Sequence, residues 1–376
     1  MADAAQADLQ DRPRARLTTV AVKSIETRRL EGRQRQQRHR EGGLCLKRVR
    51  AAASPRTCSA EDCNRLMIHC ADAIGMDLHR NRHATLQALI AVRQAVSQER
   101  EDRLDAQLIS AKLIPALVRL LLIRPRSHLA RDTVLEAAWI CTNLACAGEA
   151  AAAAVLAAAP VLALHLDCAH GYAVAEQCAW ALGNLAGEGQ DACQVLGANG
   201  VVLPLGRLLL RGCKEHAVGG TQAAACAAWA LANILFSCPS EVGHLLYLSG
   251  FPRGLTAVLR GHRNRELAVE AAWLLAFITA GPEAHMYAMI KHGAAEAVSA
   301  ALLCEASSCP QQGQGEESLL DALLRSIGNM APSRAAAGVF SAPEIKAAIA
   351  ELRQHALLAE EAQWALGNLD AMDRCI

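Results

Sequence analysis

Tryptophan and asparagine recur as pairs four residues apart along this 376-residue chain. Four pairs carry both residue types: Trp139/Asn143, Trp180/Asn184, Trp229/Asn233 and Trp364/Asn368. Residues four apart on a helix lie on one face, one turn apart. An indole face attracts a Lys or Arg cation by roughly 0.5–2 kcal/mol. The asparagine amide offers a donor and an acceptor that can hold a peptide backbone. The spacing therefore predicts a helix face suited to an extended, basic peptide.

Acidic side chains accompany these pairs at fixed offsets. Glu136, Glu270 and Glu361 each lie three residues before their tryptophan position. Gln177 has the same offset, and Glu188 follows Asn184 by four residues. Carboxylates there would favour cations. A lone tryptophan in an alanine-rich helix usually belongs to the core, and a lone helical asparagine is usually solvated or a cap. The repeated pairing favours a binding row over packing alone.

The paired segment is part of a longer internal repeat. A fifth copy has Phe277 at the asparagine position, and a sixth has Arg325 at the tryptophan position, followed by Asn329. A weaker copy lies upstream, with Ile90 at the tryptophan position. Successive copies are 39 to 52 residues apart. This range brackets the period of about 40–47 residues of armadillo and HEAT repeats. The longest interval contains residues 307–318, which are rich in Pro, Gln, Gly and Glu and predict a surface loop.

The elements that position the pairs are predicted to be stacked helices. Copies are followed by a glycine-bearing turn and a second apolar helix, as at Gly200–Leu205 and Ser249–Pro252. Pro115 fits the first turn of an earlier one, where its missing N–H costs little. Aromatic residues make up only 3% of the chain, so alanine and leucine must supply the core. We predict an all-α superhelix over residues 58–372, preceded by a basic arm over residues 1–55.

The formal net charge of +1 conceals a strong segregation of charge. Residues 1–50 hold 13 Lys/Arg against 6 Asp/Glu, a net +7, and the rest of the chain carries a net −6. A basic arm and an acidic body can attract each other. The arm could also be a solvated charge run or a nonspecific nucleic-acid arm. No aromatic residues interleave its arginines, which disfavours nucleic acid as a partner.

Several functional classes are disfavoured by composition. The longest apolar run, Ala150–Leu164, is interrupted by Pro160 and is shorter than a membrane span of about 20 residues. The 15 cysteines form no Cys-x-x-Cys pair and are expected to be buried apolar residues of a reducing compartment. No phosphate loop, nucleophile elbow or His-Glu-x-x-His pair is present. We expect no catalysis, no metal, no cofactor and no membrane partner.

These motifs resemble importin alpha, the armadillo-repeat adaptor of nuclear import. Residues Glu176–Gly189 look like the family's third repeat. Trp273–Phe277 looks like its fifth, where an aromatic also replaces asparagine, and Leu324–Asn329 looks like its sixth, where arginine also replaces tryptophan. The resemblance implies a right-handed superhelical solenoid of about seven armadillo repeats. It also implies a monomer that shuttles between cytoplasm and nucleus.

The resemblance extends to the basic arm. Residues 23–40 look like the importin-beta-binding segment, which implies that importin beta is a partner of Lys23, Arg28, Arg29, Arg35, Arg38 and Arg40. The following cluster of Lys47, Arg48 and Arg50 looks like a diluted form of the sequence with which the family occupies its own cargo groove.

The resemblance also implies two sites for basic nuclear-localisation signals of cargo proteins. The major site would use Trp139, Asn143, Gln177, Trp180, Asn184, Glu188, Trp229 and Asn233. The minor site would use Arg325, Asn329, Glu361, Trp364 and Asn368. In the major site, Glu188 stands where the family has aspartate. The family's last three repeats have no counterpart here, so the minor site is expected to be incomplete. A general armadillo scaffold with another ligand is the alternative function.

Overall fold

The computed structural model describes residues 59–76, 82–97, 105–124, 127–214, 218–261, 264–308, 317–355 and 357–373. Every regular element in these ranges is a helix, which confirms the predicted all-α class. The chain divides into two compact units, Met1–Gly42 and Gly43–Ile376, and all described residues belong to the second. The predicted arm, including the importin-beta-binding and self-inhibitory residues, lies outside the described ranges.

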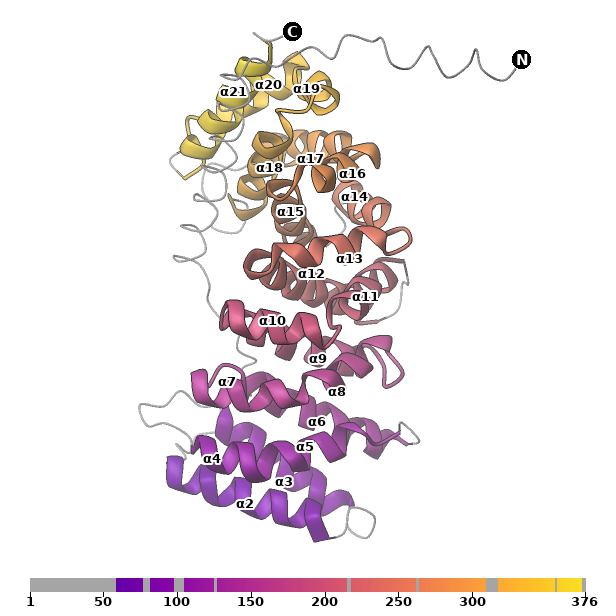
Figure 1. Cartoon of the computed structure of the whole chain (residues 1–376), viewed down its shortest axis with the longest axis vertical. Helices are drawn as coiled ribbons and strands as arrows, with labels where there is room; N and C mark the ends of the chain where they lie inside the picture. Colours follow the sequence, from indigo (N-terminus) through magenta and orange to yellow (C-terminus); the bar gives the residue numbers. More distant parts are fainter. Residues whose placement is uncertain are drawn as a thin grey trace, which may run out of the picture. The chain divides into compact units, whose positions relative to one another are not determined.

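In the described residues the helices recur in sets of three, except for the first repeat, which has two (Figure 1). The third helix of each set carries the positions of the tryptophan–asparagine motif. The third helices are α3 (Arg82–Val96), α6 (His128–Leu144), α9 (Tyr172–Gly187), α12 (Gly220–Ser237), α15 (Arg265–Ala280), α18 (Glu317–Met330) and α21 (Ala359–Asp373). The second helices are α2 (Ala60–Met76), α5 (Ile114–Leu121), α8 (Ala159–Leu164), α11 (Val202–Lys214), α14 (Phe251–Gly261), α17 (Ala294–Ser308) and α20 (Pro343–Leu352). Seven third helices within the described ranges match the predicted number of repeats.

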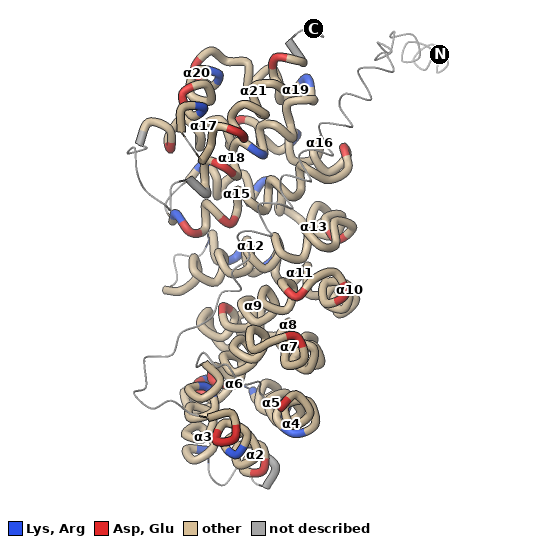
Figure 2. Tube along the Cα trace, turned by 90° about the vertical axis from the view of Figure 1, so that its left-hand side faces the viewer, with Lys and Arg blue, Asp and Glu red and all other residues tan. Residues whose placement is uncertain are grey.

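The first helices are shorter than the third helices. They are α4 (Ala106–Leu108), α7 (Glu149–Val155), α10 (Gln190–Ala198), α13 (Val242–Tyr247), α16 (Glu283–Lys291) and α19 (Arg334–Phe340). A π-helical turn, Ile109–Leu113, joins α4 to α5, and a 3₁₀ turn, Leu156–Ala158, joins α7 to α8. Acidic residues occupy the first turns of α7, α10 and α16, where a negative charge is favourable beside the positive end of the helix dipole. Figure 2 shows these acidic positions in red on the same helices.

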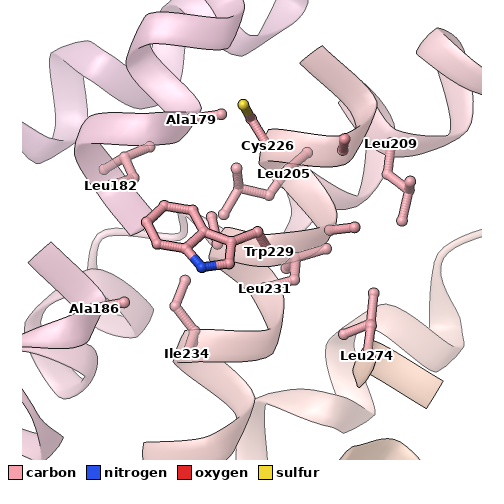
Figure 3. Packing of buried hydrophobic residues seen from close by; sticks show 14 of the residues in the cluster. Ala179, Leu182, Ala186, Leu205, Leu209, Cys226, Trp229, Leu231, Ile234 and Leu274 are labelled. Carbon is pink, nitrogen blue, oxygen red and sulfur yellow. The ribbon is translucent and has the colours of Figure 1, made fainter. Parts of the chain in front are cut away.

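Each third helix packs against the third helices of the repeats before and after it. The buried apolar residues form one continuous cluster that runs from Cys63 to Leu369. Figure 3 shows a section of it, in which the Trp229 indole lies among Leu182 and Ala186 of α9 and Ile234 of its own helix. Such a stack is stabilised repeat by repeat, since each unit buries its apolar face only against its neighbours.

The predicted glycine turns are confirmed at three corresponding places. Gly200, Gly250 and Gly293 have φ values of 67°, 78° and 85°. They precede α11, α14 and α17, where the chain must reverse through the left-handed region that glycine adopts without steric cost. Pro115 lies in the first turn of α5, as its position in the sequence predicted.

The cysteines mostly behave as small core residues. Of the eleven described, eight are buried, Cys168 and Cys213 are half-buried and Cys304 is exposed. Burial raises the pKa of the Cys70 and Cys141 thiols to about 12. The helical run Glu149–Asp167 is long and apolar enough to cross a membrane, but half of it is buried inside the stack.

Candidate functional site

The asparagines of the motif form a ladder between successive third helices. Four of these asparagines each donate a hydrogen bond from Nδ2 to a backbone carbonyl of the preceding third helix. The accepting carbonyl belongs to the residue just before the asparagine position of that helix. The pairs are Asn184 with Thr142 (3.1 Å), Asn233 with Gly183 (3.0 Å), Asn329 with Ala276 (3.0 Å) and Asn368 with Gly328 (3.1 Å). All four asparagines are buried, so their amides contribute to holding the repeats in register.

Asn143 differs from the other asparagines. Its side chain is only 4% exposed, and neither its Nδ2 nor its Oδ1 has a hydrogen-bond partner among the described residues. The Oδ1 of Asn184 and the indole N–H of Trp139 are also buried and unpartnered. A buried polar group without a partner costs about 1–3 kcal/mol. Repeats 2 and 3 therefore contain buried donors and acceptors that other described residues leave unpaired.

The tryptophans fall into two groups by exposure. Trp139, Trp180 and Trp273 are half-buried. Trp229 and Trp364 are buried, with 8% and 9% of their surface exposed. The third-helix face therefore offers indole surface mainly at repeats 2, 3 and 5, and much less at repeats 4 and 7.

Two arginines at the tryptophan position already use the recognition chemistry predicted for a ligand. Arg93 donates from Nε to Glu136 at 2.5 Å, and its guanidinium lies 4.3 Å from the centre of the Trp139 ring. Arg325 donates to Glu361 at 2.9 Å and to Asp321 at 3.2 Å, with its guanidinium 5.7 Å from the Trp273 ring.

Arg93 corrects the alignment of the first repeat. The sequence placed Ile90 at the tryptophan position, but the structure places Arg93 there, because both Arg93 and Arg325 pair with the glutamate three residues before the next repeat's tryptophan. Sequence reasoning missed Arg93 as a functional residue. The sequence feature that could have identified Arg93 is its equivalence to Arg325. This equivalence appears only when the alignment of the first repeat is shifted by three residues, from Ile90 to Arg93.

Gln177 and Glu188 occupy different environments. Gln177 is buried, and its backbone carbonyl lies 3.0 Å from the hydroxyl of Thr142, with its side-chain oxygen at 3.4 Å. It thus lies in the contact between α6 and α9. Glu188 caps α9 and is exposed, and partial desolvation and the nearby Glu149 raise its pKa. Glu188 is therefore available to a cation, whereas Gln177 is held between the helices.

Glu176 adds a titratable group one turn before Trp180. Burial, with a smaller contribution from Glu266, raises its pKa to about 6. Glu266 accepts a hydrogen bond from the Gln222 side chain at 2.9 Å. An approaching cation would favour the ionised form of Glu176.

The described residues hold no group of three or more His, Cys, Asp or Glu side chains that could bind a metal ion. A cavity of about 300 Å³ lies between α11, α12, α14 and α15, with Leu210, Cys213 and Val258 in its wall. Burial raises the pKa of the Cys213 thiol to about 11, so this cysteine is not activated as a nucleophile.

Solved structures similar to this chain are armadillo-repeat solenoids. A designed armadillo-repeat protein in complex with the peptide (KR)4 is 22% identical, with a TM-score of 0.55, over 68% of this chain and 99% of that chain. An engineered protein is 19% identical, with a TM-score of 0.63, over 83% of this chain and 74% of that chain. The fold and its serial third helices therefore define an armadillo-repeat protein.

No family model matches the sequence. The curated protein importin subunit alpha-9 of Arabidopsis thaliana is 30% identical over 296 residues, which are 76% of this chain. The chain is thus a divergent importin-alpha-like armadillo protein. It spans about half of that relative, 52% of its length.

Proposed function

We propose that this protein is a nuclear import adaptor. It binds Lys/Arg-rich nuclear-localisation signals along the third-helix face, and it binds importin beta through the basic arm over residues 1–55. The armadillo fold and the importin-alpha likeness support an armadillo-repeat binding scaffold. The choice of ligand is the proposal.

The observation that carries the proposal is the unpartnered amide of Asn143. It is buried beside Trp139, and the backbone of an extended peptide would supply both the acceptor and the donor that its side chain lacks. Pairing these groups relieves a cost that the unliganded protein bears, and this favours binding independently of peptide sequence.

The contacts of Arg93 support the preference for basic side chains. Its guanidinium has an indole on one side and a carboxylate at hydrogen-bond distance, within the chain itself. A Lys or Arg of a ligand would meet the same pair of groups at Trp180, with Glu176 one turn away. The designed armadillo protein solved with (KR)4 is a fold-level precedent for such a ligand.

The charge distribution supports the role of the arm. The first 50 residues carry a net +7, opposite in sign to the rest of the chain. Lys47, Arg48 and Arg50 then compete with cargo for the third-helix face until importin beta engages the arm. The same proposal places a weaker minor site at Arg325, Asn329, Glu361, Trp364 and Asn368.

A fluorescence-anisotropy titration of the full chain with a labelled Lys-rich nuclear-localisation peptide tests this function. Trp180→Ala should weaken binding about tenfold or more, as loss of a central aromatic anchor does. Tyr247→Ala removes an aromatic that is 92% exposed on α13 and serves as the matched control. Equal affinity of the Trp180→Ala protein and the unaltered chain would contradict the proposal.

Two further variants test the arm separately. The double change Lys47→Ala/Arg48→Ala should tighten peptide binding, because it removes the internal competitor. The double change Arg28→Ala/Arg29→Ala should abolish capture of the chain by immobilised importin beta while leaving peptide affinity unchanged. Capture that persists in this variant would remove the arm from the proposal.

A general protein-interaction scaffold is the second candidate. The observation that favours it is the hydrogen bonding of Asn184, Asn233, Asn329 and Asn368 to the neighbouring helix, since this role needs no ligand. In that case the full chain and the Lys47→Ala/Arg48→Ala variant would both fail to bind the nuclear-localisation peptide.

A further inference from the structure

We propose that the residue before the asparagine position of one third helix sets how far the next repeat's tryptophan projects. Thr142 thereby makes the space between Trp139 and Trp180 the principal slot for a Lys or Arg side chain. This inference rests on the proposed function and specifies where along the stack the strongest basic-side-chain contact is made.

The buried rings lie directly on glycines of the preceding repeat. A Cβ added at Gly183 would overlap Cζ3 and Cε3 of the Trp229 ring. A Cβ added at Gly328 would overlap the ring of Trp364 in the same way. Each glycine stands immediately before the asparagine of its helix. Figure 3 shows the Trp229 ring beside Leu182 and Ala186 of α9. Without a side chain at this position, the ring can pack closely against the backbone.

The half-buried rings have a side chain at that place. The residue at the glycine's position on the preceding third helix is Val96 for Trp139, Thr142 for Trp180 and Ala232 for Trp273. All three rings are more exposed than Trp229 and Trp364. The five tryptophans therefore separate by one feature, the presence of a Cβ on the neighbouring helix. Steric exclusion by that carbon is the physical cause that fits all five.

Thr142 cannot move aside for Trp180. It is fully buried, and its hydroxyl lies 3.1 Å from the Ala138 carbonyl oxygen and 3.0 Å from that of Gln177. Its own carbonyl accepts the hydrogen bond from Asn184. Both ends of the residue are thus fixed between α6 and α9. The ring of Trp180 must remain raised over it.

The consequence is a graded row of slots. Trp139 and Trp180 are both half-buried, and Asn143, whose amide is buried and unpartnered, lies one helical turn after Trp139. Arg93 covers Trp139 from the side of the first repeat. The other wall of the next slot is Trp229, whose ring packs on Gly183 and is buried, so it offers less indole surface to the methylene stem of a lysine or arginine.

The full chain labelled with 5-fluorotryptophan tests the ring positions without any ligand. Each of the five tryptophans gives one fluorine resonance, assigned with single Trp→Phe variants, and its shift between H₂O and D₂O reports exposure. Thr142→Gly should lower the exposure of Trp180, and Gly183→Ala should raise that of Trp229. Thr142→Ala keeps the Cβ but loses the hydroxyl, so Trp180 should stay exposed. Gly367→Ala is the matched control, since a Cβ there meets no atom within 4 Å.

The same variants are then titrated with a fluorescein-labelled (KR)4 peptide. Thr142→Gly should weaken binding about 2- to 30-fold, the range of a cation–indole contact. Thr142→Ala should restore affinity to within about twofold of the unaltered chain. Equal Trp180 exposure in the Gly and Ala variants would overturn the ring-position rule. If Trp180 becomes buried in the Thr142→Gly variant but its affinity for (KR)4 is unchanged, Thr142 is not a specificity determinant.

Failure of the proposed function gives a different result. The unaltered chain and the Lys47→Ala/Arg48→Ala variant would then not bind (KR)4 at all. The fluorine measurement would still decide whether Thr142 and Gly183 set the exposure of the rings.

Discussion

At the residue scale, the same residue type serves two purposes along this chain. Four asparagines connect one third helix to the next, whereas Asn143 keeps both amide atoms unpartnered. The arginines at positions 93 and 325 likewise occupy the place of a tryptophan and pair with glutamates. Identical spacing in sequence therefore does not guarantee an identical role.

Replacing Asn143 and Asn184 separately should distinguish the two roles. Asn184→Ala removes a hydrogen bond between α6 and α9 and should lower the free energy of unfolding by about 1 kcal/mol. Asn143→Ala should leave it unchanged or slightly raised, because no internal bond is lost, while weakening peptide binding. Urea unfolding and anisotropy measure the two effects. A larger stability loss for Asn143→Ala than for Asn184→Ala would refute the assignment.

Glu176 should make stability depend on pH. Folding raises its pKa from 4.5 to about 6. The unfolded chain therefore loses the Glu176 proton at a lower pH than the folded chain does. The free energy of unfolding consequently falls as the pH rises from about 4.5 to 6. Glu176→Gln should therefore stabilise the protein at pH 7 by about 1 kcal/mol, after allowance for solvent screening. It should have no effect near pH 4. Thermal unfolding across this range measures the difference, and equal pH profiles would rule out this glutamate as the source.

At the element scale, polar bonds and ring contacts connect successive third helices. The α3–α6 junction uses the Arg93–Glu136 ion pair, whose side chains are 12% and 13% exposed. The α9–α12 junction uses the Asn233 bond and the contact of Trp229 with Gly183. Polar contacts therefore fix the register of helices whose remaining contacts are mostly between alanine and leucine.

The Arg93–Glu136 pair should be strongly coupled. Arg93→Met leaves a largely buried carboxylate without its cation and should cost about 2–3 kcal/mol of unfolding free energy. The double change Arg93→Met/Glu136→Met should recover most of that loss, since apolar replacements of a buried pair are often nearly neutral. A double-mutant cycle by urea unfolding measures the coupling. Additive losses would show that the pair contributes no specific interaction.

At the scale of the described unit, the structure is a series of repeats that contact their neighbours. One apolar cluster runs through all of them, but each repeat packs only on the units before and after it. Damage to one repeat should therefore spread a limited distance along the stack.

Gly212→Val tests this locality. A side chain at Gly212 of α11 would overlap the Gly220 backbone at the start of α12, and no small shift of a flexible side chain relieves that contact. Amide hydrogen exchange should show lost protection in repeat 4 and its neighbours, with α3 and α21 retaining theirs. Gly243→Val adds a side chain on α13 with no atom within 4 Å and is the control. Uniform loss of protection would indicate one cooperative unit.

The sequence by itself determined the all-α class, the number of repeats and the glycine turns at Gly200 and Gly250, because these depend on local periodicity and backbone freedom. It also indicated the third-helix face through the Trp–Asn spacing. Only the tertiary structure decided that Arg93 belongs at the tryptophan position, that the described residues leave both amide atoms of Asn143 unpartnered, and that Trp229 is buried while Trp180 is half-buried. These properties depend on what the neighbouring repeat places opposite each residue, and partners about 40 residues away are not encoded in any local pattern.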